Sequence, residues 1–115
     1  MKAYKAFNND WTCQGFQYEV GQSYETEGQP KLCERGFHAC KSALDCFRYY
    51  DCSQWNKFAD VEMGGTIIEA KDDSKVCSSK ITIVRELSFA EFLEVIKKQG
   101  SDSVASSHGV NGSDG

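Results

Sequence analysis

The sequence predicts an α+β fold, with a mainly antiparallel sheet of short strands and two helices. Two observations lead to this prediction. Segments with the alternation of strands outnumber helical patterns, and the helical patterns do not alternate regularly with them along the chain. The chain has 115 residues, which suits one domain with its own hydrophobic core. We expect this domain to span residues 1–99, followed by a flexible Gly/Ser-rich tail at residues 100–115.

The first strand is predicted at residues 2–7, where side chains alternate between two faces. Lys5 should share its face with Ala3 and Phe7, and the residues between them should point the other way. Two more short strands should flank a tight turn at Gly21, and a further strand should lead into the first helix. These three strands cover residues 16–20, 22–25 and 36–40.

The later strands are predicted around two adjacent glycines. Residues 58–63 and 66–70 flank Gly64-Gly65, which suits the tight turn of a β-hairpin because glycine tolerates positive φ. Residues 79–84 alternate well and are rich in β-branched side chains, so they predict another strand.

Two helices are expected, and the second has the clearer signals. Ser88 and Glu91 form a capping box at its start, and Gly100 marks its end. Its apolar stripe consists of Phe89, Phe92, Leu93 and Ile96. The first helix should begin near Ser42, which has a weaker capping spacing to Asp45.

The composition excludes several classes of protein. The formal net charge is −4 at pH 7, which argues against direct binding of nucleic acid through phosphate contacts. The sequence has no apolar run long enough for a membrane-spanning helix, and its N-terminus lacks the apolar stretch of a signal peptide. We therefore expect a cytoplasmic protein, in which the six cysteines are reduced rather than joined in a disulfide framework.

The most concentrated polar chemistry lies in residues 32–40, with the sequence Leu-Cys-Glu-Arg-Gly-Phe-His-Ala-Cys. His38 and Cys40 are two residues apart on a predicted strand, so their side chains should share a face. A Cys–His pair can act as nucleophile and base, but no orienting group is recognisable, and packing is the favoured interpretation. The cysteine spacings do not match structural zinc sites, so neither a metal nor another cofactor is expected.

Two charged residues are further candidates, each with a structural alternative. Glu62 lies on a predicted strand and could act as a catalytic carboxylate, or it could pair with a Lys or Arg on a neighbouring strand. Arg35 could clamp a carboxylate or phosphate of a ligand, or it could anchor a loop through an ion pair.

Aromatic residues are more numerous than a core of this size needs, so some rings should be exposed. Exposed aromatic residues commonly anchor protein interfaces. The best candidate patch combines Arg48 with Tyr49, Tyr50 and Trp55. We predict that this patch, together with Arg35, binds a protein.

Several segments of the chain resemble a family of uncharacterised domains found in phages and prophages. They include residues 2–7, 15–19, 49–50 and 75–81, and the block at residues 32–40 is a hallmark of that family. The resemblance covers most of residues 1–87 and departs at Ala6, where the family typically has Gly. It implies a phage or mobile-element origin without implying an activity.

A more distant similarity is to the ADP-ribosyltransferase fold. A strand with Lys5, a Gly-aromatic strand with His38 and a helix that ends at Tyr50 resemble the layout of those enzymes. The similarity implies an NAD-derived ligand, with Lys5, His38 and Glu62 as candidate residues. Lys5 stands where those enzymes carry His or Arg, and their late Glu motif is not evident in this sequence.

We expect a binding module rather than an enzyme. Small size, acidity, excess aromatic residues and the phage resemblance favour a protein that occupies the surface of a host protein, such as a nucleic-acid-binding defence protein. A counter-defence inhibitor of the anti-CRISPR type is the concrete form of this hypothesis. The alternatives are an ADP-ribosyltransferase-like enzyme or NAD-derivative binder, and a structural module that carries a repeat tail.

Overall fold

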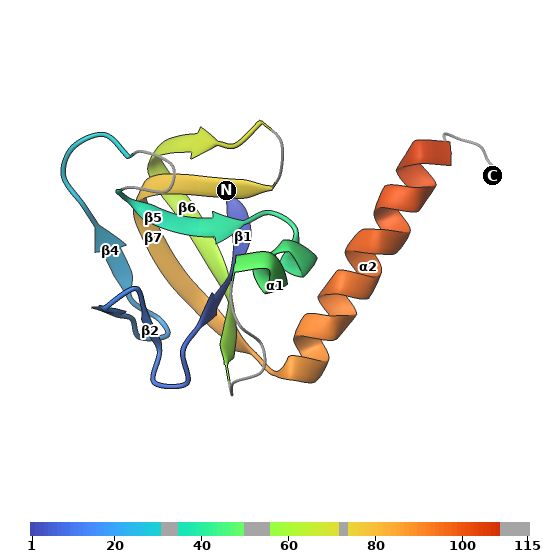
Figure 1. Cartoon of the computed structure of the whole chain (residues 1–115), viewed down its shortest axis with the longest axis horizontal. Coiled ribbons are helices and arrows are strands. Elements are labelled where there is room, and N and C mark those ends of the chain that lie inside the picture. Colours follow the sequence, from blue (N-terminus) through green and yellow to red (C-terminus); the bar gives the residue numbers. More distant parts are fainter. Residues whose placement is uncertain (31–34, 50–55, 72–73, 109–115) are drawn as a thin grey trace.

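The chain folds into a curved antiparallel sheet with a long C-terminal helix, which confirms the predicted α+β class (Figure 1). The structure, a computed structural model, describes residues 1–30, 35–49, 56–71 and 74–108. The strands are β1 (Lys2–Phe7), β2 (Thr12–Cys13), β3 (Phe16–Gln17), β4 (Ser23–Glu25), β5 (Phe37–Cys40), β6 (Lys57–Glu69) and β7 (Lys75–Leu87). The helices are the 3-10 turn η1 (Ala43–Asp45), the short α1 (Cys46–Tyr49) and α2 (Phe89–His108).

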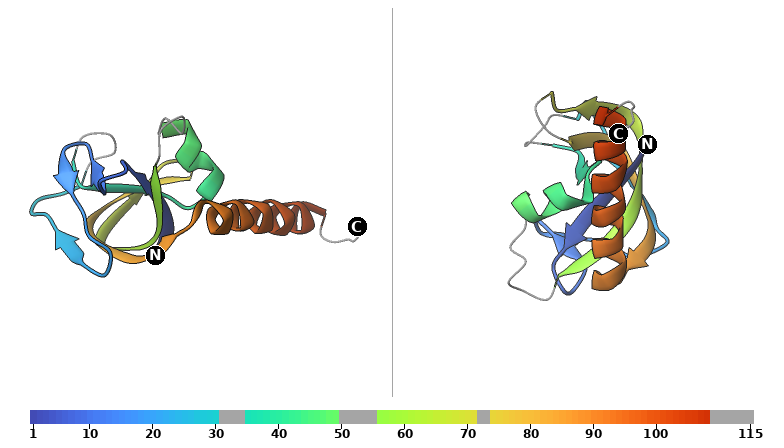
Figure 2. Two further views of the ribbon diagram at one scale, coloured as in Figure 1. Left: turned by 90° about the horizontal axis from the view of Figure 1, so that it is seen from below. Right: turned by 90° about the vertical axis from the view of Figure 1, so that its right-hand side faces the viewer.

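Four strands close the sheet on itself. β1 pairs with β5 on one side and β6 on the other, and β7 pairs with both β5 and β6, all antiparallel. β4 extends the sheet along β7, and β2 pairs with β3 in a separate small hairpin. The curvature of β6 and β7 that closes the sheet is visible in Figure 2.

The side chains of β1 alternate between two faces, as the sequence predicted, and each face contributes to a separate hydrophobic core. Ala3 and Phe7 point into the closed sheet, whereas Tyr4 and Ala6 point outward. The inner core also contains Val61, Met63, Val76, Ile81 and Ile83. The outer core, which the helices cover, also contains Cys46, Phe58, Leu87 and Phe92.

The predicted hairpin at Gly64-Gly65 is wrong. β6 continues through both glycines as one strand, and its register with β7 shifts between Gly64 and Ile67. Gly65 has a φ of +69°, and a Cβ at this position would overlap the side chain of Ser79. The glycines therefore form a bulge rather than a turn, and a bulge of this kind bends a strand and helps the sheet to close.

The predicted hairpin around Gly21 is also wrong. β3 pairs with β2 instead of β4, and β4 pairs with β7. Gly21 still makes a turn, with a φ of +90°, and its N–H donates to the carbonyl of Ile83 at 2.7 Å. The turn at Gly21 therefore directs the chain so that β4 pairs with β7 and not with β3.

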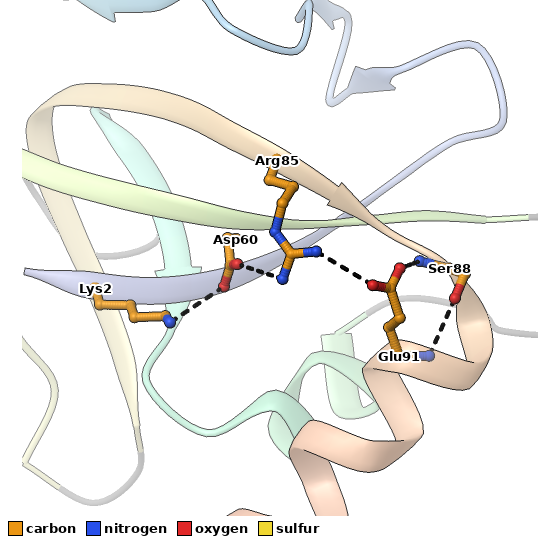
Figure 3. Close-up of polar contacts among 5 residues, drawn as sticks. All are labelled: Lys2, Asp60, Arg85, Ser88 and Glu91. Atoms are coloured by element: carbon orange, nitrogen blue, oxygen red, sulfur yellow. Dashed lines mark hydrogen bonds and ion pairs between the residues drawn. The ribbon is translucent and has the colours of Figure 1, made fainter.

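The N-terminal end of α2 is fixed by the predicted capping box. Ser88 N donates to Glu91 Oε1 at 2.8 Å, and Glu91 N donates to Ser88 Oγ at 3.1 Å. Arg85 donates to Glu91 Oε2 at 3.2 Å and to Asp60 Oδ2 at 3.4 Å, and Lys2 Nζ lies 3.7 Å from Asp60 Oδ1 (Figure 3). These contacts join the helix start to β1, β6 and β7.

The C-terminal end of α2 differs from the prediction. The helix does not end at Gly100 but continues to His108, so the predicted start of the tail lies within a helix. Gln99 fastens the helix to the segment around η1, because it accepts from Ala43 N at 2.8 Å and donates to Lys41 O at 2.9 Å. Residues 109–115 lie outside the described residues.

The helices have one more property that bears on function. Within the part of the chain that the structure describes, none of them combines the length and the apolar character needed to cross a membrane.

Candidate functional site

Only part of the predicted protein-binding patch falls within the described residues. Arg35 and Arg48 are both exposed, and Arg48 Nη1 lies 3.7 Å from Asp45 Oδ1. Tyr49 is the last residue of α1. Tyr50 and Trp55 lie outside the described residues. The patch therefore stays a prediction.

Glu62 has a structural partner at the chain terminus. Its carboxylate accepts a hydrogen bond from the N-terminal ammonium of Met1, which also donates to the carbonyl of Met63 at 2.8 Å. Val61 and Met63 point into the inner core, so the exposed Glu62 between them faces outward. Glu62 and the inward-facing Lys5 consequently lie on opposite faces of the sheet.

Lys5 is buried in the inner core, with only 2% of its surface exposed. Its Nζ donates to the backbone carbonyl of His38 and lies 5.7 Å and 5.8 Å from the ring centroids of Tyr18 and Phe7. Burial lowers the pKa of Lys5 below its usual value, and the nearby thiol of Cys13 partly opposes this effect. The structure thus brings Lys5 and His38 together through the His38 backbone.

The side chains of His38 and Cys40 both lie on the outer face of β5, as the alternation predicted. His38 is half-buried, and Cys40 is buried in the outer core. A hydrogen bond with Cys40 and burial raise the pKa of the neighbouring Cys46 thiol, whose Sγ lies 3.5 Å from the carbonyl oxygen of Tyr4. A raised pKa keeps the Cys46 thiol protonated and makes it a poor nucleophile. Cys40 is buried in the same core, so packing is the role that this geometry supports for Cys40.

The other described thiols are also packed in the core. Cys13, Cys40, Cys46 and Cys77 are buried thiols. Cys77 Sγ donates to the carbonyl of Arg35 at 2.9 Å. Among the residues that the structure describes, no group of three or more His, Cys, Asp or Glu side chains is placed to hold a metal ion.

A pocket opens at one end of the closed sheet, next to the block at residues 32–40. It has a volume of about 280 Å³ and lies between the β2–β3 hairpin, the end of β4 and the start of β5. The lining residues are Cys13, Gln14, Phe16, Tyr18, Glu25, Thr26, Gly36 and Phe37. Open ends of closed sheets are frequent ligand sites, because side chains from several strands converge there.

Aromatic rings form the apolar part of this pocket. The centroid of the Phe16 ring lies 4.7 Å from that of Tyr18, 5.3 Å from that of Tyr24 and 5.9 Å from that of Phe37. Tyr18 and Phe37 are buried, whereas Phe16 is 41% exposed. Phe16 therefore presents apolar surface to solvent at the rim of a packed aromatic cluster.

The hairpin that forms one wall of the pocket has an unusual backbone. Trp11 and Gln14 have φ values of +67° and +51°, in the left-handed region that residues other than glycine rarely adopt. Gln14 and Gly15 form a two-residue turn with positive φ at both positions, which matches the twist of the flanking strands. Left-handed residues other than glycine each cost about 1–3 kcal/mol and cluster at binding sites.

The polar side of the pocket is acidic. Glu25 contributes a carboxylate, and Gln14 and Thr26 contribute neutral polar groups. Residues 6–30, which supply most of the lining, contain four acidic residues and no Lys or Arg. This number equals the formal net charge of the whole chain, −4, so the remaining sequence is electrically balanced.

Sequence reasoning identified only the part of the pocket that lies in one block. Gly36 and Phe37 belong to residues 32–40, but the other lining residues fall between Cys13 and Thr26. The absence of basic residues from 6–30 is the sequence signal that could have pointed to this face.

The comparison with known proteins identifies a family without assigning an activity. Residues 1–95 match a family described as a domain of unknown function (DUF7666), and this range includes the whole pocket. No curated protein and no solved structure shows significant similarity to the chain. The match covers most of the chain, which therefore belongs to the DUF7666 family.

Proposed function

We propose that this domain is a protein-binding module whose binding face is the aromatic pocket at the end of the closed sheet. The exposed ring of Phe16 carries the proposal, because it contacts three other rings and is still 41% open to solvent. A partner that covers this ring would remove apolar surface from water. Rigid aromatic residues in pockets are common energetic centres of protein interfaces.

The source and partner class follow from the sequence resemblance. A phage or mobile-element origin would make the domain a counter-defence inhibitor of the anti-CRISPR type, acting in the cytoplasm of the host cell. The acidic face suits a host protein with a basic surface, such as a defence protein that normally binds nucleic acid. The domain would act by occupying that surface, without catalysing a reaction.

The two alternatives remain predictions. The ADP-ribosyltransferase-like reading needs Lys5, His38 and Glu62 to act on one ligand, but Lys5 is buried and Glu62 lies on the opposite face of the sheet. The structural-module reading depends on a repeat tail whose last residues, 109–115, lie outside the described residues. No observation on the described residues favours either alternative over protein binding.

The test compares two exposed phenylalanines on different elements, β3 and α2. Phe16 lies at the pocket, whereas Phe89 is 56% exposed at the start of α2 (Figure 1). Tagged full-length wild type, Phe16→Ala and Phe89→Ala would each capture proteins from bacterial host lysates. We expect wild type and Phe89→Ala to retain the same stoichiometric host protein. Against that purified protein, Phe16→Ala should bind about tenfold more weakly in calorimetry, as for an interface anchor.

The variants also define the outcomes that contradict the proposal. Circular dichroism first establishes that Phe16→Ala and Phe89→Ala are folded. Equal binding by wild type and Phe16→Ala would show that the pocket is not the binding face. Loss of binding in Phe89→Ala alone would place the face on α2. If no host protein is retained by the wild type, the protein-binding function itself is wrong.

A further inference from the structure

We infer that the pocket accepts the cationic side chain of a lysine or arginine presented by a basic protein partner. This inference rests on the proposed function and specifies the chemistry that the partner brings. The same pocket supplies two features that a cation requires, aromatic faces and a nearby carboxylate.

The exposed part of the Phe16 ring suits a cation. Phe16 packs edge-to-face against Tyr24 and Phe37, with centroid distances of 5.3 Å and 5.9 Å, so these rings contact one another, and Phe16 and Phe37 line the pocket. Phe16 is still 41% exposed, and aromatic rings carry a partial negative charge on their faces that attracts ammonium and guanidinium groups. The core of this protein already contains such a contact, because Lys5 Nζ lies 5.7 Å from the ring centroid of Tyr18.

Glu25 provides the counter-charge. Its exposed carboxylate lines the pocket and forms no ion pair with any residue in the described ranges. Across β4 and β7, the residue opposite Glu25 is the exposed Lys80. A cation that enters between Glu25 and the rings would gain a charge-assisted hydrogen bond as well as the aromatic contacts.

The charge of the surrounding chain acts in the same direction. Residues 6–30 carry the four acidic residues Asp10, Glu19, Glu25 and Glu27 without a basic residue. A negative face attracts a basic partner over several ångströms and orients it before contact. Charge complementarity therefore favours a basic protein surface over an acidic or neutral one.

The size of the pocket suits a side chain. Its volume of about 280 Å³ lies just below the roughly 300–1,000 Å³ of pockets that enclose drug-sized ligands. A lysine or arginine side chain on a folded partner can reach such a space while the partner covers the exposed ring of Phe16. A whole dinucleotide is larger than a single side chain and fits a pocket of this volume poorly.

Three basic residues oppose a second cation, because like charges repel. Lys80 lies opposite Glu25 across β4 and β7, and Arg35 Nη1 lies 3.7 Å from the position of a Cβ at Gly28. The third, Lys5, is buried beside Tyr18, and its ammonium donates to the carbonyl of His38. The inference requires the carboxylate of Glu25 to outweigh these charges, which the Glu25→Gln variant tests.

The test uses small probes that isolate one side chain. The methylamides of N-acetyl-lysine, N-acetyl-arginine and the neutral N-acetyl-norleucine are titrated into the full chain and followed by amide NMR. We expect both cationic probes to shift the signals of Thr26 and Gly36. Norleucine should bind about threefold to fivefold more weakly, which corresponds to one exposed cation–π contact. Glu25→Gln should weaken the cationic probes by a similar factor, whereas Glu94→Gln on the exposed face of α2 should not.

Several results would overturn the inference. Equal binding of norleucine and lysine probes would make the pocket a general apolar site. Tighter binding of choline than of either cationic probe would indicate a free small cation instead of a protein side chain. If a host protein binds through Phe16 while Glu25→Gln has no effect on that binding, the proposed function stands and this inference fails. If the cationic probes bind but no host protein is captured, the cation site stands and the protein-binding function fails.

Discussion

Lys5 places an amine inside the closed sheet, where water does not solvate it. Its Nζ contacts the backbone of His38 on β5 and the rings of Phe7 and Tyr18. Because Tyr18 also lines the pocket, this amine connects the inner core to the candidate site. Burying a cation destabilises a fold unless its partners compensate, so Lys5 has a measurable effect on stability.

We predict that Lys5→Met reduces the dependence of stability on pH. The pKa of Lys5 is lower in the folded protein than the value of 10.5 that applies to the unfolded chain. The unfolded state therefore binds the proton more tightly, and protonation of Lys5 favours unfolding. The contribution of Lys5 to the free energy of unfolding is least favourable below its folded-state pKa and improves as the pH rises toward 10.5.

Urea denaturation near pH 7 and near pH 10, in reducing buffer, measures this effect. Lys5→Met should be more stable than wild type at the lower pH and should lose that advantage at the higher pH. Lys2→Met is the control, because the side chain of Lys2 is 65% exposed. If the difference in the free energy of unfolding between Lys5→Met and wild type stays constant with pH, then burial does not lower the pKa of Lys5.

The elements show which parts of the fold could be predicted from the sequence. Alternation along β1 predicted both faces correctly, because it depends only on the local geometry of a strand. Gly64-Gly65 was misassigned, since a two-residue turn and a bulge have the same local composition and differ only in whether β6 continues along β7. The Gln14-Gly15 turn was missed because Gln is unusual at a position with positive φ.

The candidate site was harder to predict than the elements. The pocket joins Gly36 and Phe37 to residues from Cys13 to Thr26. These segments meet because β4 and β5 both pair with β7, which is a long-range property of the sheet. The number of aromatic residues indicated that some rings are exposed, but it did not point to Phe16, because the clustering of rings around Phe16 depends on packing across different strands.

A substitution at Gly36 tests the turn that leads from the pocket into β5. The φ of Gly36 is +95°, and a Cβ would lie 2.8 Å from Cys77 Sγ and 2.9 Å from the side chain of Pro30. Gly21 has a similar φ of +90° but nothing within 4 Å of a Cβ. Both Gly→Ala variants should lose about 1–2 kcal/mol from the left-handed backbone. Gly36→Ala should lose about 1–3 kcal/mol more, because the added methyl group overpacks its surroundings.

Thermal and urea denaturation of Gly36→Ala and Gly21→Ala measure this difference. Because Gly36 lines the pocket, its variant should also bind the cationic probes more weakly, whereas Gly21→Ala should bind them as the wild type does. Equal destabilisation of the two variants would mean that the strand entrance can shift to accept a Cβ, contrary to the prediction.

At the scale of the whole molecule, β1 joins two cores that lie on opposite sides of the sheet. The inner core reaches the pocket through Tyr18 and Phe37, and the outer core packs under α2 around Phe92. Phe92 stacks on Phe58 with a centroid distance of 4.3 Å. The family match extends to residue 95 and so includes this part of α2. The start of the helix is therefore part of the domain that contains the pocket.

We predict that both cores unfold together and that Phe92→Ala destabilises them equally. Phe92 is fully buried, so its removal should lower the free energy of unfolding by about 3–5 kcal/mol. Phe89→Ala, at an exposed position one turn earlier, should cost far less. NMR signals of Ile83 in the inner core and Val95 in α2 report the two regions during urea titration. The native signals of both residues should disappear at the same urea concentration, because β1 belongs to both cores and cannot lose one face and keep the other. Phe92→Ala should lower this common midpoint. If Ile83 and Val95 report different midpoints and Phe92→Ala lowers only that of Val95, then α2 unfolds independently and the pocket does not depend on the helix.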